Sequence, residues 1–224
     1  MNIAIDGPAG AGKSTVARLV AKRLGYVYVD TGAMYRAVTW KVLQQGLQVE
    51  QTQLVIRTAE QMTIELQPGE LAQQVLADGQ DVSEEIRHPE VSNRVSYVAQ
   101  IPEVRKLLVD KQQQMARQKG VVMDGRDIGT HVLPDAEVKV FLTASVQERA
   151  SRRYQELQSK NQTVSLSQLE HDIALRDKMD EERETSPLRQ AEDAVVVDST
   201  KLSIEQVVDK IVSLTAVYAG KEYE

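Results

Sequence analysis

The chain has 224 residues, enough for one good-sized domain or for one domain that carries a small insert. Hydrophobic residues make up 42% and charged residues 27%, which excludes wholesale disorder, and the net charge of −6 argues against a general binder of nucleic acid or anionic membranes. Cysteine is absent, which excludes disulfides and cysteine-bound metals. With no signal peptide or membrane span evident, we expect a cytoplasmic protein.

Short apolar runs alternate with longer helical patterns along most of the chain. We expect five buried strands, at residues 3–5, 26–29, 121–123, 138–142 and 194–197. Helical patterns occupy residues 13–24, 33–45, 146–158 and 203–218, and the last begins with Ser203 and Gln206 at the spacing of a capping box. Apolar runs without polar alternation are typical of a parallel sheet covered on both faces. The pattern predicts an α/β fold with a five-stranded parallel sheet.

Residues 62–83 depart from this alternation. Pro68-Gly69 and Asp78-Gly79 separate short strand-like segments, and Asp-Gly is a strong hairpin-turn signal. We therefore expect a small antiparallel insert, followed by helices near residues 89–100 and 103–119. The polar stretch 159–167 predicts a mobile connection.

A glycine-rich motif lies between the first strand and the first helix. The residues that match G-x-x-x-x-G-K-[ST], with the one that follows, are Gly7, Pro8, Ala9, Gly10, Ala11, Gly12, Lys13, Ser14 and Thr15. The glycines let the backbone wrap around an anion, and the amides at the start of the helix point at it. Lys13 can reach the β- and γ-phosphates of a nucleotide, and the Ser14 hydroxyl can ligate Mg²⁺. The motif predicts a nucleotide phosphate site.

Arginines gather at other positions where ligands bind in open α/β sheets. Asp124-Gly125-Arg126-Asp127 follows one strand, and the stretch DTGAMYR at 30–36 follows another. Arg176, Asp180 and Arg183 share one face of a predicted helix. A second helical set consists of Arg149, Arg152 and Arg153. Each set alone is typical of a solvated face, but together with the phosphate loop they indicate a site for highly charged anions.

Two features narrow the class of nucleotide-binding protein. No guanine-reading segment of the N-K-x-D type is present, which argues against a GTPase. The strands that end in Asp124 and Asp198 lack a second carboxylate beside them, which argues against motor and regulatory ATPases.

Five stretches taken together resemble the bacterial cytidylate kinase family: IDGPAGAGKST, VDTGAMYR, DGRDIGT, RDKMDEER and DSTKLSIEQV. The resemblance covers nearly the whole chain and implies a P-loop core of residues 1–35 and 106–224. A helical lid would lie at about 146–165. The nucleoside monophosphate region would be 36–105, with the antiparallel insert at about 62–83.

The activity that the resemblance implies is Mg²⁺-dependent transfer of the γ-phosphoryl group of ATP to CMP or dCMP. Gly7 to Thr15 would hold ATP, and Ser14 would ligate the metal. Phosphate ligands or neutralisers would be Thr31, Arg36, Arg126, Arg176 and Arg183. Cytosine would be read by Ser96, Arg105 and Asp127, and Asp180 with Arg176 would contact the pentose. The catalytic cations would be Lys13, Arg126, Arg153, Arg176 and Arg183, with Arg153 in the lid. We expect a monomer whose partners are ATP and CMP or dCMP.

These residue types suit the reaction. The acceptor phosphate has a second pKa near 6, so at neutral pH it is mostly dianionic and needs no general base. Cations offset the repulsion between two anions held in line. A carboxylate such as Asp127 is the natural acceptor for the N4 amino group of cytosine, although Asp127 could instead pair with Arg126 or cap a helix.

Two alternatives stay open from the sequence alone. One is another small-molecule P-loop kinase, acting on uridylate, deoxynucleotides or an alcohol, for which Asp30 or Asp124 would be the base. The other is a nucleotide-dependent regulatory protein with slow ATP hydrolysis.

Overall fold

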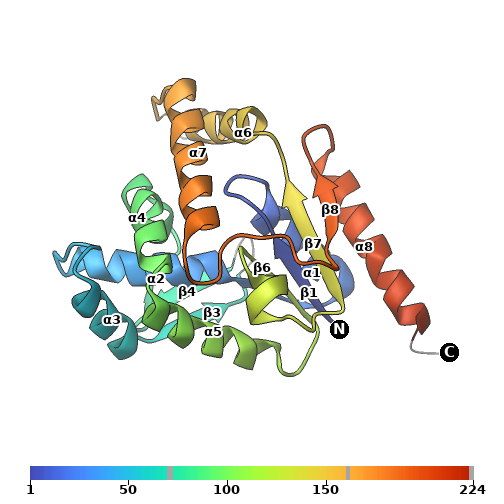
Figure 1. Ribbon diagram of the computed structural model, residues 1–224, viewed down its shortest axis with the longest axis horizontal. Helices are drawn as coiled ribbons and strands as arrows, with labels where there is room; N and C mark the ends of the chain where they lie inside the picture. Colours follow the sequence, from blue (N-terminus) through green and yellow to red (C-terminus); the bar gives the residue numbers. More distant parts are fainter. Residues whose placement is uncertain (70–72, 160–161, 222–224) are drawn as a thin grey trace. The chain divides into compact units, whose positions relative to one another are not determined.

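The computed structural model describes residues 1–69, 73–159 and 162–221, and the chain divides into two compact units. One unit comprises Met1–Val27 and Gly120–Glu224, and we call it the core unit. The other comprises Tyr28–Lys119, and we call it the inserted unit. Both can be followed by colour along the chain in Figure 1.

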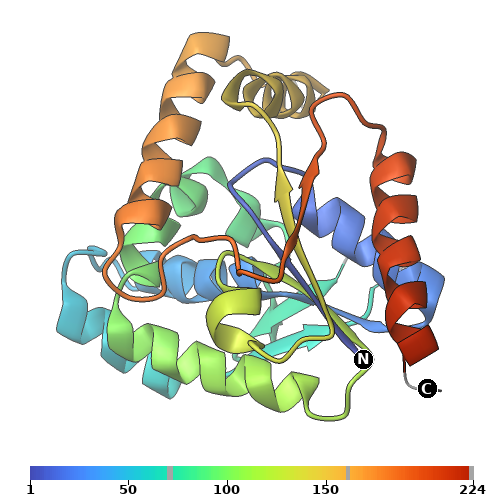
Figure 2. The same ribbon diagram turned by 45° about the vertical axis from the view of Figure 1, so that its right-hand side comes forward.

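The core unit alternates strands and helices. Its elements in chain order are β1 (Asn2–Asp6), α1 (Lys13–Leu24), β6 (Val121–Gly125), the π-helix η2 (Ile128–Val132), β7 (Val138–Thr143), α6 (Val146–Ser159), α7 (Leu166–Glu182), β8 (Val195–Asp198) and α8 (Ile204–Lys221). Helix α8 packs against α1, and α6 packs against α7 (Figure 2).

The main sheet has five strands in the order β2-β6-β1-β7-β8, and β2 (Val27–Asp30) runs across the boundary between the units. Strand β1 has β6 and β7 as parallel neighbours, and all five of its residues are buried. Strand β7 also pairs in parallel with β8. The predicted five-stranded parallel sheet is confirmed, and each predicted strand lies within two residues of its observed bounds.

The inserted unit is mainly helical and has a small sheet of its own. Its elements after β2 are α2 (Thr31–Gln44), α3 (Thr52–Gln61), β3 (Ile64–Gln67), β4 (Gln74–Ala77), β5 (Gln80–Asp81), the 3₁₀ helix η1 (Glu85–Arg87), α4 (Pro89–Ala99) and α5 (Pro102–Ala116). Strands β3, β4 and β5 form an antiparallel sheet in that order, which confirms the predicted insert. Helix α3 is an element that the sequence pattern did not predict.

Turn chemistry explains the tight connection between β4 and β5. Asp78 and Gly79 have φ angles of 51° and 79°, the left-handed pair that a two-residue hairpin requires. The Asp78 carboxylate also accepts the Thr63 amide at 2.8 Å and pairs with Lys41 at 2.6 Å. At the other predicted turn, Pro68-Gly69, the following residues 70–72 lie outside the described chain, as do 160 and 161 in the predicted mobile connection.

The inserted unit is wider than the nucleoside monophosphate region expected at 36–105, and the limits of that region stay a prediction. The compact unit begins at Tyr28 and ends at Lys119. Helices α2 and α5 lie inside it because their apolar faces belong to one hydrophobic cluster with α3, β3, β4 and α4, a cluster that runs from Ala33 to Leu108.

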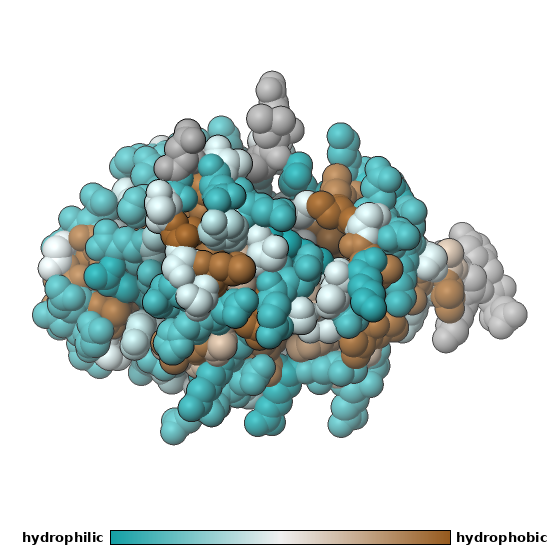
Figure 3. Space-filling model, turned by 90° about the horizontal axis from the view of Figure 1, so that it is seen from above, coloured by the Kyte–Doolittle hydropathy of each residue, from teal (hydrophilic) through white to brown (hydrophobic). Residues whose placement is uncertain are grey.

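Within the described ranges, we find no helix with the combined length and apolar character that crossing a membrane requires. On the face drawn in Figure 3, hydrophilic residues predominate and apolar ones are scattered.

Candidate active site

The glycine-rich loop connects β1 to α1 in the core unit, as the motif requires. Gly7 has a φ of 149°, and a Cβ there would come within 1.9 Å of the Leu142 carbonyl oxygen, so only glycine fits. Gly12, with a φ of 90°, precedes the first residue of α1, Lys13. The Lys13 ammonium group donates to the Pro8 carbonyl oxygen at 2.8 Å. Burial and then the charge of Arg126 hold the pKa of Lys13 well below its usual value, and Arg176 adds to the effect.

A hydroxyl and a carboxylate meet beside this loop. Ser14 Oγ, in α1, donates to Asp124 Oδ2, near the end of β6, at 2.9 Å. Oxygen ligands of this kind are the ones that Mg²⁺ prefers, and Mg²⁺ usually takes only one or two of them from the protein. The pair therefore fits a nucleotide-bound magnesium ion. Within the described residues, no cluster of three or more histidine, aspartate or glutamate side chains suggests a metal site made by protein alone.

Asp6, the last residue of β1, holds the segment that follows β6. Its two carboxylate oxygens accept the backbone amides of Ile128 and Gly129, each at 2.7 Å. Burial, helped by the nearby charge of Asp127, raises the pKa of Asp6 to about 7 even though these hydrogen bonds lower it. Asp6 thus fixes the backbone just after Arg126 and Asp127, a role that the sequence motifs did not indicate.

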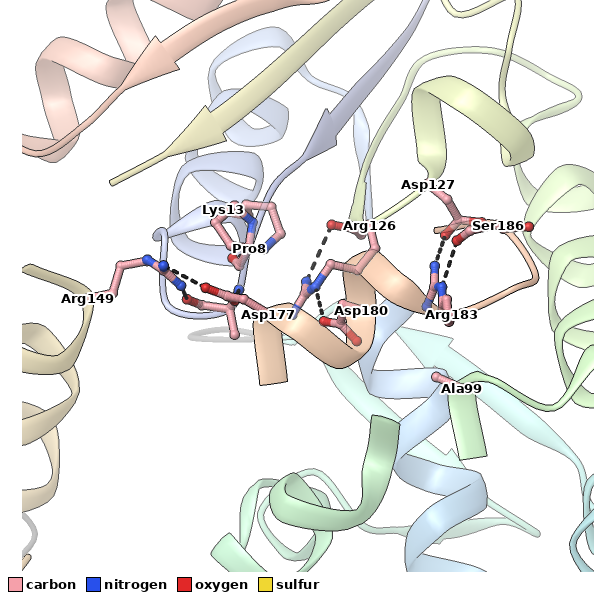
Figure 4. A network of polar contacts seen from close by, with 12 residues as sticks. Pro8, Lys13, Ala99, Arg126, Asp127, Arg149, Asp177, Asp180, Arg183 and Ser186 are labelled. Atoms are coloured by element: carbon pink, nitrogen blue, oxygen red, sulfur yellow. Dashed lines mark hydrogen bonds and ion pairs between the residues drawn. The ribbon is translucent and has the colours of Figure 1, made fainter. Parts of the chain in front are cut away.

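Arg126, Arg149 and Arg183 of the core unit each pair with a carboxylate (Figure 4). Arg126 Nε donates to Asp180 Oδ2 at 2.8 Å, and both side chains are largely buried. Burial by itself would raise the pKa of Asp180. The positive charges of Arg126, Arg176 and Arg183 have the larger combined effect, so the pKa of Asp180 is below its usual value.

Asp127 Oδ1 lies 3.4 Å from Arg183 Nη2, and the two side chains form an ion pair. Asp127 occupies the N-cap position of η2, but its side chain makes no capping hydrogen bond. Arg183 also donates through Nε to the Ser186 carbonyl oxygen at 2.6 Å. Although the sequence pattern placed Arg183 on a helix face with Arg176 and Asp180, Arg183 is the C-cap residue with an extended backbone. Because the backbone is no longer helical at Arg183, its side chain does not follow the face of α7 and instead reaches Asp127, in the segment after β6.

The three arginines of α6 take three different partners. Arg149 is buried, and its guanidinium group contacts Asp177 and the carbonyl oxygen of Ala9. Arg152 donates to the Ser199 carbonyl oxygen at 2.8 Å, and Arg153 pairs with Glu156 at 2.7 Å. The family resemblance implies a lid role for Arg153, whereas in the structure Arg149 is the member of the set with a hydrogen bond to the glycine-rich loop. Arg153 lies one helical turn further along α6 and is more exposed, with 31% of its side chain accessible against 4% for Arg149. The sequence alone does not show this difference in burial.

The inserted unit holds the remaining predicted residues. Asp30 caps α2 by accepting the Ala33 amide at 2.9 Å, and the next residue, Thr31, is buried at the start of that helix. Arg36 follows on α2, where a Cβ at Gly32 would lie 3.1 Å from its Nη1.

Arg105 and Ser96 are buried in the same unit. Arg105, on α5, donates to the Ala99 carbonyl oxygen at 3.0 Å, and its guanidinium carbon lies 5.3 Å from the centroid of the Tyr35 ring. Ser96 lies on α4 and is 8% exposed. The two arginines and two hydroxyls of this unit thus come from α2, α4 and α5.

The fold and the loop define a class. A parallel sheet in which β1 leads through a glycine-rich loop into α1, with a buried lysine, a hydroxyl beside a carboxylate and several buried arginines, is the arrangement of a P-loop phosphotransferase.

Comparison with known proteins specifies the family. The family model for cytidylate kinase matches residues 3–216. A cytidylate kinase from Bacillus cereus (strain ATCC 10987 / NRS 248) is 56% identical over 216 residues, 96% of each chain, and one from Bacillus anthracis (strain CDC 684 / NRRL 3495) is 56% identical over 214 residues, 96% of this chain and 95% of that protein. This chain belongs to the cytidylate kinase family.

A solved structure supports the fold alone. An uncharacterized protein from Eubacterium ventriosum (ATCC 27560) superposes with a TM-score of 0.51 and is 9% identical, over 95% of this chain and 96% of that one.

Proposed function

We propose that this protein transfers the γ-phosphoryl group of ATP to CMP or dCMP, giving ADP and CDP or dCDP, in pyrimidine nucleotide metabolism. Membership of the family supports the reaction, and the observation that carries it is a set of buried or largely buried cations in the core unit. Lys13, Arg126, Arg149 and Arg183 lie within the same compact unit as the glycine-rich loop, in a chain whose net charge is −6.

ATP is assigned to the loop from Gly7 to Thr15. The backbone amides at the start of α1 face an anion, and Lys13 supplies the positive charge for the β- and γ-phosphates. Because its pKa is lowered by burial and by neighbouring arginines, this lysine gains more from an anion than a solvated lysine would.

A divalent cation, Mg²⁺, is assigned to Ser14, with Asp124 beside it. When bound, the ion would neutralise phosphate charge. The protein's own contribution is to hold the Ser14 hydroxyl and the Asp124 carboxylate 2.9 Å apart at the start of α1.

The acceptor nucleotide is assigned to the residues that the family resemblance implies, which are Thr31, Arg36, Ser96, Arg105, Arg126, Asp127, Arg176, Asp180 and Arg183. Arg126, Arg176 and Arg183 neutralise phosphate charge, and Asp180 with Arg176 contacts the pentose. Arg153, on α6, is assigned to the lid that covers the transferred group.

The chemistry needs no general base, because the acceptor phosphate is a dianion near neutral pH. An alcohol kinase would need one, and the two carboxylates suggested for that role are already engaged. Asp124 accepts the Ser14 hydroxyl, and Asp30 caps α2 and faces Arg87 at 3.6 Å. Their partners favour positioning over proton abstraction.

An acceptor panel tests the proposal. ADP release is measured with CMP, dCMP, UMP, AMP and simple alcohols at fixed Mg²⁺ and ATP. We expect CMP and dCMP to support turnover far better than the others. Steady ATP hydrolysis that CMP does not change would instead favour a regulatory ATPase.

Asp127→Ala tests the base reader. A carboxylate accepts the cytosine N4 amino group and opposes the O4 lone pairs of uracil, so the variant should lose kcat/KM for CMP by about 10²-fold or more while ATP affinity changes little. Equal kcat/KM for CMP in variant and wild type would refute the assignment of Asp127.

The monomeric state and the cytoplasmic location stay predictions from the sequence.

A further inference from the structure

The guanidinium group of Arg149 ties α6 to the glycine-rich loop. Its side chain is 4% exposed. Nη1 donates to the Ala9 carbonyl oxygen at 2.8 Å, and Nε donates to the Ala144 carbonyl oxygen, just before the helix, at 2.9 Å. The third nitrogen, Nη2, lies 2.7 Å from Asp177 Oδ2. All five donors of a guanidinium group need partners when it is buried, and these three contacts meet most of that need.

Asp177, on α7, reaches the same loop by two routes. Its Oδ2 pairs with the Arg149 guanidinium group, which donates a hydrogen bond to the Ala9 carbonyl oxygen. Its Oδ1 accepts the Ala9 amide at 3.4 Å. One carboxylate therefore acts on both polar groups of Ala9, on the amide directly and on the carbonyl through Arg149. Figure 4 shows the pair of Asp177 and Arg149.

The loop carbonyls matter because a carbonyl oxygen repels phosphate, whereas an amide attracts it. The two consecutive carbonyl oxygens of Pro8 and Ala9 each accept a hydrogen bond from a cation, Lys13 for the first and Arg149 for the second. The next residue, Gly10, has a φ of 76°, and a Cβ there would lie 3.3 Å from Arg149 Cβ. The backbone of α6 thus packs close to the turn of the loop.

We propose that Asp177 is a positioning residue for the phosphates of ATP, acting through Arg149 and through the Ala9 peptide. It contacts the loop and the arginine, and it sets the orientation of the loop backbone on which the phosphates would rest. The inference rests on the proposed function, because it concerns the ATP side of that reaction. It assigns Asp177 to ATP and not to the acceptor nucleotide.

The test measures the two nucleotides separately in the full-length protein. Binding of Mg-ATP is measured by calorimetry, and KM for ATP and for CMP by ADP release. Asp177→Ala should raise both the Kd of Mg-ATP and KM for ATP about tenfold, with KM for CMP within twofold of wild type. Asp177→Asn keeps the shape of the side chain and one carbonyl oxygen. Its Kd for Mg-ATP and its KM for ATP should therefore lie between those of wild type and those of Asp177→Ala.

Matched variants separate positioning from general damage. Asp172→Asn makes the same change on the same helix at a residue that bonds Gln168, and it should leave every constant unchanged. Arg149→Met should reproduce the Asp177→Ala pattern, and the double variant should be no worse than the more impaired single variant, because the two residues act as one unit.

Three results would overturn the inference. They are an unchanged Kd for Mg-ATP in folded Asp177→Ala, a parallel rise of KM for ATP and CMP, and full additivity with Arg149→Met. Should Asp177→Ala not fold, the Asn variant decides on the same criteria. A wild-type protein that binds Mg-ATP but does not phosphorylate CMP would refute the proposed function alone, since the calorimetric series still tests Asp177.

Discussion

The interiors of the two units are built differently. Among the described residues, the buried charged side chains of the core unit are Asp6, Lys13, Asp124, Asp127, Arg149, Asp177, Asp180 and Arg183, whereas those of the inserted unit are Asp30 and Arg105. The inserted unit instead buries one continuous apolar cluster that includes Met34, Val38 and Leu108.

The difference indicates that buried charges contribute less to the stability of the core unit than apolar burial contributes to that of the inserted unit. Burying an ion costs several kcal/mol, and a pair in good geometry only offsets that cost. Burying an aliphatic side chain stabilises the fold outright, by about 1.5–3 kcal/mol. The core unit therefore holds groups whose purpose is a charged ligand, while the inserted unit relies on apolar packing.

Lys13→Met should sharpen this comparison most strongly. Loss of the cation at the transferred phosphate should lower kcat about 10³-fold or more. Thermal stability should stay equal or rise, because burial lowers the pKa of Lys13 and so opposes its charge in the folded state. The coupled ADP assay and a melting curve measure both effects. Lys22→Met, at an exposed position of the same helix, should change neither. A destabilised Lys13→Met protein would contradict the comparison.

Leu108→Ala should have the next largest effect. The side chain is 1% exposed in the apolar cluster, so the cavity should cost about 2–5 kcal/mol in free energy of unfolding. The Kd of Mg-ATP should not change, because the ATP loop belongs to the core unit. Urea denaturation and calorimetry are the measurements. Leu107→Ala, at a partly buried neighbour, should cost less. Equal losses at both positions would show that the cluster is not the source of stability.

The pH dependence of stability should reveal the charge cost at Asp6. Its folded pKa of about 7 exceeds the unfolded value near 3.9, so its contribution to stability is full below the unfolded pKa and is lost as the pH rises toward 7. Compared with Asp6→Asn, the free energy of unfolding of the wild type should fall by about 1.4 kcal/mol per pH unit between pH 5 and 7, and level off above 7. The lowered pKa of Asp180 works in the opposite direction in both proteins and cancels in the difference. A difference that does not vary with pH would refute the prediction.

The smallest effect is expected at the capping box of α8. The Ser203 hydroxyl accepts the Gln206 amide at 3.2 Å, and the Gln206 side chain accepts the Ser203 amide at 2.8 Å. Ser203→Ala should cost about 1 kcal/mol in the free energy of unfolding and leave kcat and both KM values unchanged. Ser213→Ala, at an exposed position of the same helix, is the control. A larger loss at Ser213 would show that the box is not what stabilises the start of α8.

Much of this protein follows from local sequence, because the physical causes are local. The run of buried apolar residues in β1, the turn residues Asp78 and Gly79, and the capping residues Ser203 and Gln206 each act over a few positions, and all three predictions are confirmed. The glycine-rich loop is also marked locally, since Gly7 and Gly12 have positive φ angles, although the contact with Leu142 that excludes a side chain at Gly7 is tertiary.

What only the tertiary structure decided is which polar groups meet. Asp6 and Gly129 are 123 residues apart, and Arg149 and Ala9 are 140 apart, so no spacing rule could connect them. Sequence alone could not distinguish the roles of Arg149 and Arg153, because both are arginines on one face of the same helix. They differ only once the packing of neighbouring elements buries one guanidinium group and leaves the other partly exposed. Partner choice depends on burial, and burial is a property of the packed chain.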